Sequence, residues 1–259
     1  MTTQLAPETI FNDLLQRLID ALSLGITDFE IKKIERDAAP LKKIDISDWY
    51  EVGAHIAALR RDFAGQDRLF EAAYINASDK ADTVQRHLVL LAGLGRTEKL
   101  KEQFDRFLPM LRNDPELIRN TSSLLVGAGW IFTASKLASE LDRLNAASTT
   151  PFPCALAIRD VDRSSMDESE VSEQAIAEAV GHAHQYLRSV NALPNAIETS
   201  VVPYEEGKAG LMYQFKVDKD ADTVSDIEWK LFEELAEREF PVERAGTVAF
   251  SLLAGRVDG

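Results

Sequence analysis

Two similar stretches lie 34 residues apart: LLAGLGR at residues 90–96 and LLVGAGW at residues 124–130. Amphipathic helices are expected around them, over 79–93, 97–112, 114–127 and 130–145. Two helices and two turns in 34 residues is the period of a helical-hairpin repeat. Gly95 and Gly129 fall at the turn inside each hairpin, where glycine adopts positive φ and lets the two backbones approach. The pattern predicts helical-hairpin repeats, with an irregular helical bundle as the alternative.

This period resembles that of the tetratricopeptide repeat. The resemblance covers about residues 48–147, with a shorter first unit over 48–78 around Gly65, Phe70 and Tyr74. It is degenerate, because the family's small residue in the first helix is Leu88 in one copy and Ser122 in the other. The resemblance implies a groove between successive first helices that binds a peptide or a partner's helix. Candidate groove residues are the polar side chains of these helices: Arg86, Arg119, Asn120 and Ser123.

Helix-start signals divide the first half of the chain further. Thr27 and Glu30 form an expected capping box, and Asp48 and Glu51 form another. Asp114 precedes Pro115, which predicts a side-chain cap followed by proline in the first turn. Gly25 is expected to end the first helix. We therefore expect helices from near the N-terminus to residue 147.

The stretch NAASTTPFP at 145–153 marks the boundary of a second domain, because two prolines interrupt helix formation. We predict a helical domain over 1–147, a linker over 148–153 and a second domain over 154–259. Strands are expected at 154–161, 196–204, 211–217 and 247–255. Helices are expected at 168–190 and after a capping box of Ser225 and Glu228. This βαββαβ order is that of the ferredoxin-like plan, so the chain is assigned to the α+β class.

The strands alternate between two kinds of side chain. Leu211, Tyr213, Phe215 and Val217 are expected to face the helices. The helix expected after Ser225 and Glu228 carries the apolar residues Trp229, Leu231, Phe232, Leu235 and Ala236. Small, mostly apolar residues occupy the other sheet face, which predicts that the helical domain or a second copy of the chain covers it, the latter as a homodimer. These residues are Ala155, Ala157, Met212, Gln214, Ala249, Ser251 and Leu253.

Charge is distributed unevenly between the two halves. Residues 1–150 carry 19 basic and 22 acidic residues, a net charge of 19 − 22 = −3, and residues 151–259 carry 10 and 21, a net charge of 10 − 21 = −11. A strongly acidic domain disfavours nucleic acid as a ligand and favours a basic protein partner. An inhibitor, an immunity-type protein or a DNA mimic is the narrower form of this hypothesis. The single cysteine, Cys154, and the lack of a long apolar segment favour a cytoplasmic protein that binds no membrane.

Catalytic motifs are scarce. Asp160 and Asp162 form a D-x-D at the end of the first expected strand, and Glu205 and Glu206 lie in the expected hairpin. This arrangement resembles the Mg²⁺ site of palm-type nucleotide cyclases and polymerases, but the cyclase glycine-glycine-acidic signature is absent. We expect no cofactor and no resident metal. The preferred interpretation is a non-enzymatic, regulatory protein-binding protein; the alternative is a divergent Mg²⁺-dependent nucleotide enzyme.

Overall fold

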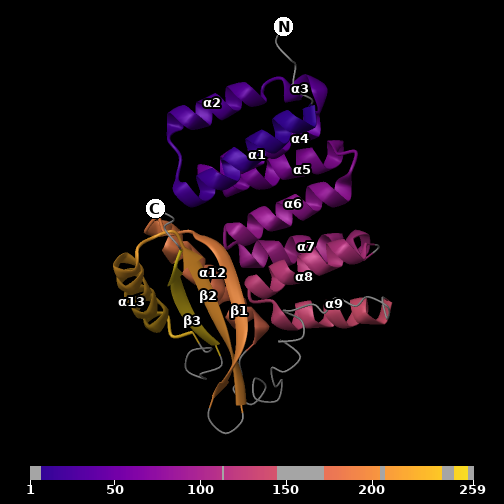
Figure 1. Cartoon of the computed structure of the whole chain (residues 1–259). Coiled ribbons are helices and arrows are strands. Elements are labelled where there is room, and N and C mark those ends of the chain that lie inside the picture. Colours follow the sequence, from indigo (N-terminus) through magenta and orange to yellow (C-terminus); the bar gives the residue numbers. More distant parts are fainter. Residues whose placement is uncertain (1–6, 113, 145–171, 205–207, 241–247, 256–259) are drawn as a thin grey trace. The chain divides into compact units, whose positions relative to one another are not determined.

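The structure is a computed structural model that describes residues 7–112, 114–144, 172–204, 208–240 and 248–255 (Figure 1). The chain forms two compact units, unit 1 at Met1–Leu90 and unit 2 at Leu91–Gly259. The boundary lies inside helix α6 (Lys80–Gly93). Each unit is described by itself.

Unit 1 is helical. It contains α1 (Pro7–Leu24), α2 (Asp28–Ala38), α3 (Leu41–Ile44), α4 (Ile46–Leu59), α5 (Phe63–Asn76) and the first part of α6. Helix α4 packs against α1 and α5, and the core is built from the apolar stripes of α1, α2 and α4. Its most deeply buried members are Leu14, Leu18, Ile34, Leu41 and Val52.

The helix starts of unit 1 follow local side-chain chemistry. The capping box of Thr27 and Glu30 is confirmed, and Gly25 follows α1 with a φ of +81°. The start predicted at Asp48 is wrong. Asp45 is the N-cap of α4, and its carboxylate accepts hydrogen bonds from the amides of Ser47 and Asp48. The earlier aspartate satisfies the free amides first, so Asp48 already lies in the first turn.

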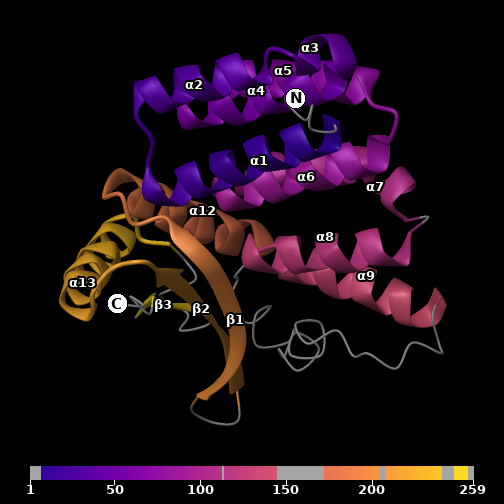
Figure 2. The same ribbon diagram turned by 45° about the horizontal axis from the view of Figure 1, so that its top comes forward.

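Unit 2 combines helices with a small sheet (Figure 2). Three helices come first: α7 (Thr97–Leu111), α8 (Pro115–Gly127) and α9 (Ile131–Leu144). They are followed by α12 (Glu173–Ser189), β1 (Pro194–Tyr204), β2 (Lys208–Val217), α13 (Ala221–Glu237) and β3 (Val248–Ala254). The described residues are thus mostly helical with a three-stranded mixed sheet, which confirms the α+β class. The strand predicted at 154–161 and the linker at 148–153 lie outside the described residues.

Strand pairing differs from the ferredoxin-like plan. The sheet order is β1-β2-β3, with β1 antiparallel to β2 and β2 parallel to β3. In the ferredoxin-like plan another strand splits each parallel βαβ pair. Here Leu211 pairs with Val248 and Phe215 with Leu252, so β2, α13 and β3 form an unsplit βαβ unit. The predicted strand order is therefore wrong for the described sheet, because strand alternation does not specify which strands are neighbours.

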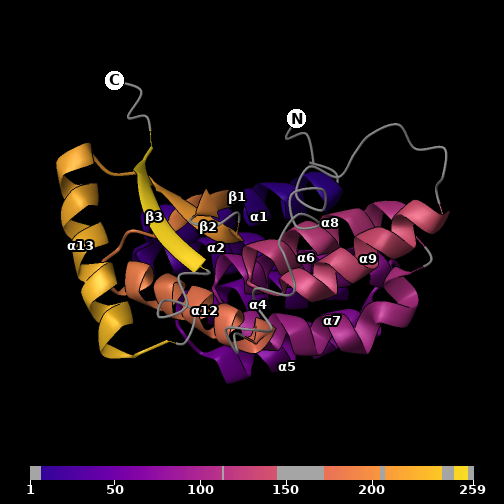
Figure 3. The same cartoon turned by 90° about the horizontal axis from the view of Figure 1, so that it is seen from below.

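One face of the sheet forms the core of unit 2. Leu211, Tyr213, Phe215 and Val217 are fully buried, as predicted, and Phe250 of β3 lies beside the rings of Tyr213 and Phe215. Helix α13 contacts β3, and α12 contacts both α13 and α7 (Figure 3). Helices α7–α9 therefore belong to the same compact unit as the sheet, although the sequence predicted a domain boundary between them.

Helix α12 explains the two repeated glycines. Gly95 and Gly129 have φ values of +64° and +89°, as expected for these turns. The close neighbour is, however, not the second helix of the hairpin. A Cβ on Gly129 would lie 2.6 Å from the Cα of Ala177 in α12, and a Cβ on Gly95 would collide with the side chain of His184. The glycines let α12 lie against both turns.

Polar contacts fix α12 in this position. Thr97 Oγ1 donates to the carbonyl of Ala177 at 2.9 Å, and Trp130 Nε1 donates to the carbonyl of Thr97 at 2.8 Å. The carboxylate of Glu173, at the start of α12, accepts from the amide and the hydroxyl of Thr133 at 2.7 and 3.0 Å. Because Thr133 lies in the first turn of α9, Glu173 satisfies an amide that the helix itself leaves free.

Helix α12 also carries a buried histidine. The His184 ring lies edge-on to Phe215 with centroids 5.3 Å apart, and its Nδ1 has no hydrogen-bond partner among the described residues. Burial, assisted by the charge of Arg188, lowers the pKa of His184 to about 4. The side chain is therefore neutral at pH 7 and contributes packing.

No described helix is both long and apolar enough to cross a membrane.

We predict that Gly129→Ala destabilises the protein by about 2–4 kcal/mol, because the methyl group meets the backbone of α12 and the left-handed conformation disfavours alanine. Gly127→Ala is the matched control. Gly127 ends α8, and a Cβ there meets no atom within 4 Å. We expect that substitution to be neutral or to stabilise by about 0.5–1 kcal/mol. Urea unfolding measures both, and equal effects would contradict the role assigned to α12.

Candidate functional site

The carboxylates predicted for a nucleotide-enzyme site are not described. Asp160, Asp162, Glu205 and Glu206 lie outside the described residues, as do Ala155 and Ala157 of the predicted covered face. Among the residues that are described, no group of three or more histidine, cysteine, aspartate or glutamate side chains could hold a metal ion.

The predicted groove residues fall in both compact units. Arg86 lies on α6 in unit 1, whereas Arg119, Asn120 and Ser123 lie on α8 in unit 2. Asn120 and Ser123 are exposed and Arg119 is half-buried, and the hydroxyl of Ser123 donates to the carbonyl of Arg119. A peptide groove formed by all four stays a prediction.

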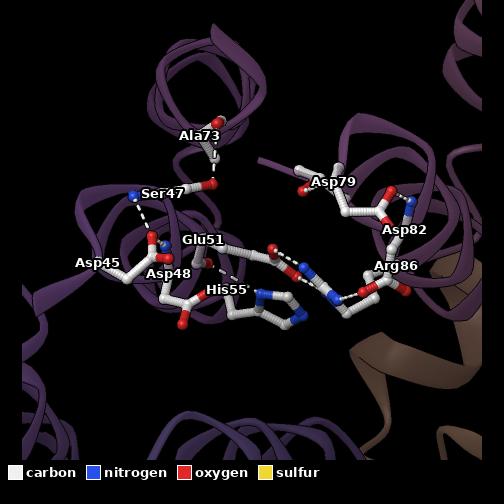
Figure 4. A network of polar contacts seen from close by, with 10 residues as sticks. Asp45, Ser47, Asp48, Glu51, His55, Ala73, Asp79, Asp82 and Arg86 are labelled. Atoms are coloured by element: carbon white, nitrogen blue, oxygen red, sulfur yellow. Dashed lines mark hydrogen bonds and ion pairs between the residues drawn. The ribbon is translucent and has the colours of Figure 1, made fainter. Parts of the chain in front are cut away.

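Arg86 belongs to a polar network in unit 1 (Figure 4). Its Nε and Nη2 donate to the two carboxylate oxygens of Glu51 at 2.6 and 2.9 Å, and its Nη1 donates to Asp82. The Glu51 side chain is only 5% exposed. Burial alone would lower the pKa of Arg86, but the hydrogen bonds and charges of Glu51 and Asp82 outweigh it and raise that pKa. The forked contact makes this a buried, charge-assisted pair.

Two ionisable side chains next to this pair, His55 and Asp48, have shifted pKa values. His55 Nδ1 lies 3.0 Å from the carbonyl oxygen of Glu51, and burial lowers the His55 pKa, so the ring is neutral at pH 7. Burial raises the pKa of Asp48 to about 6, assisted by the charges of Asp45 and Glu51. Ser47 donates to the carbonyl of Ala73 at 2.9 Å and so joins α4 to α5.

This network is best explained as a structural device. The bidentate contact occupies both oxygens of Glu51, and both charges of the pair are largely removed from water. Asp48, whose pKa is raised to about 6, borders the pair, and the described residues contain no metal cluster. Within unit 1 the pair links α4, which carries Glu51, to α6, which carries Arg86.

The second sheet face is open to solvent in part. Its side chains on β2 and β3 are all half-buried, and Lys216 of β2 forms an ion pair with Glu198 of β1. Described residues therefore leave this face incompletely covered, and its covering by another domain or a second copy stays a prediction. The face comprises Met212, Gln214, Lys216, Ala249, Ser251 and Leu253.

Helix α13 presents a different surface, which the sequence analysis did not find. The start predicted from Ser225 and Glu228 is wrong, because Asp220 is the N-cap and Glu228 instead accepts a hydrogen bond from the amide of Leu252 at 2.7 Å. Val224, Leu231 and Leu235 are the buried residues of this helix, and Trp229 and Phe232 lie outside that buried stripe. Trp229 is 68% exposed and Phe232 is 39% exposed.

Carboxylates surround the exposed tryptophan. Residues at intervals of three and four on an α-helix share one side. Around Trp229 these are Asp222, Asp226, Glu233 and Glu237, and all four are exposed. The Trp229 Nε1 donates to Glu233 Oε1 at 2.9 Å, which orients the indole. We call this surface the acidic-aromatic face; it consists of Asp222, Asp226, Trp229, Phe232, Glu233 and Glu237.

Two signals in the sequence point to this face in retrospect. The helix 221–237 contains large apolar residues, Trp229 and Phe232, in addition to those of its buried stripe. Its acidic residues recur at intervals of three and four residues on the side of Trp229. The buried stripe consists of Val224, Leu231 and Leu235.

No protein-family model matches the chain, and comparison with curated proteins and with solved structures finds no significant match.

We predict that Glu51→Gln lowers the free energy of unfolding by about 2–4 kcal/mol, because it leaves the mostly buried Arg86 without its bidentate partner. Glu35→Gln is the control, since Glu35 pairs with Arg60 where both side chains are more than 40% exposed. That change should cost less than about 1 kcal/mol. Chemical denaturation of both variants tests this, and equal losses would show that the buried pair has no special weight.

A second prediction concerns pH. The folded-state pKa of Asp48, about 6, lies above its ordinary value of 3.8, so ionising Asp48 costs stability as the pH rises through this range. Asp48→Asn removes that cost. We expect it to stabilise the protein by about 1–2 kcal/mol at pH 7.5 and to have almost no effect at pH 4. Denaturation curves at the two pH values measure the difference, and a gain of the same size at both would refute the assignment.

Proposed function

We propose that the protein is a non-enzymatic binding protein that recognises a protein partner through the acidic-aromatic face of unit 2. The observation that carries this proposal is the 68% exposure of Trp229 on an ordered helix. A large aromatic side chain gains most from burial, and tryptophan is enriched among the residues that dominate the energy of protein interfaces.

The support of α13 favours the same function. The opposite side of the helix is fixed by fully buried Leu231 and Leu235, and the carboxylate of Glu228 is tied to the backbone of β3. A partner therefore meets a surface that is already ordered, which reduces the conformational entropy lost on binding. The titratable groups buried in unit 1 are, by contrast, engaged with each other.

We propose three other roles that use different residues. Peptide binding by tetratricopeptide-like hairpins would use Arg119, Asn120 and Ser123 of α8. An inhibitor, immunity-type or DNA-mimic role would use the acidic charge of the second half. A cytoplasmic location accords with the single cysteine. The nucleotide-enzyme alternative depends on Asp160 and Asp162, outside the described residues.

The test is affinity capture from native-host lysate with the full-length protein as bait and quantitative mass spectrometry as the readout. The double substitution Trp229→Ala/Phe232→Ala should reduce capture of a specific partner at least tenfold. Phe29→Ala is the control, because Phe29 is a 77% exposed aromatic side chain on α2 of unit 1. Equal capture by all three baits, or loss with Phe29→Ala alone, would refute the assignment to α13.

A further inference from the structure

The charges of α13 specify what kind of partner fits the acidic-aromatic face. The helix contains six carboxylates, on Asp222, Asp226, Glu228, Glu233, Glu234 and Glu237, and one lysine, Lys230. Two of the six have partners elsewhere in unit 2: Glu228 binds the amide of Leu252, and Glu234 lies 3.8 Å from His182. The other four carboxylates lie on the face itself.

The carboxylates of the face have no ion-pair partner in the part of the chain that the structure describes. Asp222, Asp226 and Glu237 form no ion pair with any described residue. Glu233 accepts one hydrogen bond from Trp229 and keeps acceptor capacity on both oxygens. Four negative charges that converge on one helical side repel each other, and a cationic partner relieves that repulsion.

Their spacing defines the length of the partner segment. At 1.5 Å per residue, Asp222 and Glu237 are about 22 Å apart along the helix, with Asp226 and Glu233 at about 6 and 16 Å. Trp229 lies near the middle, and Phe232 borders it. The face thus combines an apolar centre with negative charge on both sides. A complementary segment has an apolar side chain at its centre and lysine or arginine side chains about 5–12 Å away on either side.

We propose that the acidic-aromatic face of α13 binds a lysine- or arginine-rich segment of a protein, with an aliphatic or aromatic anchor placed against Trp229 and Phe232. The cations pair with Asp222, Asp226, Glu233 and Glu237. A lysine or arginine that reaches the indole gains a cation–π contact in addition. This inference rests on the proposed binding function and names the chemistry of the partner. Nucleic acid and acidic protein surfaces are excluded by charge.

The experiment uses the full-length protein and a fluorescently labelled 16-residue amphipathic helical peptide of lysine and leucine, with fluorescence anisotropy as the readout. A glutamate–leucine peptide of the same length is the negative probe. We expect saturable binding of the lysine–leucine peptide that weakens at least tenfold between 50 and 300 mM salt, and no binding of the glutamate–leucine peptide. Binding of both peptides with similar affinity would overturn the proposal.

A protein with a net charge of −14 attracts cationic peptides at many places on its surface. Substitutions are therefore needed to show that the peptide binds at the acidic-aromatic face. Asp226→Asn/Glu233→Gln removes two charges from the face and should weaken binding at least fivefold and reduce its salt dependence. Asp28→Asn/Glu35→Gln removes two charges from exposed residues of α2 and should change binding less than twofold. Equal effects of the two pairs would show general charge attraction and overturn the proposal.

A second comparison measures how much the aromatic side chain of Trp229 contributes to peptide binding. It also distinguishes failure of this inference from failure of the proposed binding function. Trp229→Ala should weaken binding at least tenfold, and Phe29→Ala should leave it unchanged. If Trp229→Ala abolishes capture of the natural partner but not binding of the lysine–leucine peptide, the binding function stands and the basic-segment inference fails. If Trp229→Ala changes neither measurement, both fail. Circular dichroism of each variant verifies that α13 remains folded.

Discussion

At Gly129 the backbone of α12 comes so near that a methyl group would lie 2.6 Å from the Cα of Ala177. That approach, repeated at Gly95 beneath His184, joins the helical hairpins of unit 2 to its sheet. From this position α12 supplies His184 to the packing around Phe215, and Glu173 to the first turn of α9. Tyr213 of β2 completes the connection, because its hydroxyl donates to the carbonyl of Val126 in α8 and burial keeps its pKa raised. The glycines are thus needed for contact between segments far apart in sequence.

The two 17-residue helices of unit 2, α12 and α13, differ in how much of their surface is buried. Nine residues of α12 are buried but only three of α13, so α12 is a core element and α13 has a free side. Polar groups also differ between the interior and the exposed surface. Buried ones have partners or are neutral, as in the Glu51–Arg86 pair of unit 1 and the His184 ring, whereas the carboxylates near Trp229 remain charged and exposed. The proposed binding of a partner rests on this exposed charge on a helix that is fixed on its other side.

Ionisable groups in the interior also show that packing alone can perturb a pKa strongly. Asp48 titrates near 6 because burial and two neighbouring carboxylates disfavour its charge. His184 has a pKa near 4 because it is enclosed by apolar groups and lies near Arg188. Neither shift is accompanied by a metal cluster among the described residues, and each follows from packing between helices. Structural ion-pair networks perturb pKa values as catalytic sites do, so geometry must decide between them.

Many local features of this protein could be predicted from its sequence, although the helix starts predicted at Asp48 and Ser225 were wrong because an earlier aspartate caps each helix. The helices around Gly95 and Gly129, the cap at Thr27, the start at Asp114 and the alternation of β2 all rest on neighbouring residues whose spacing sets the pattern. Non-local relations could not be predicted. Which strands pair, what approaches the two glycines and which side of α13 stays exposed depend on contacts across many residues. Trp229 illustrates the reason. It is a large apolar residue in an amphipathic helix, but the side of that helix that is buried, with Leu231 and Leu235, depends on contacts with distant segments, and Trp229 stays exposed.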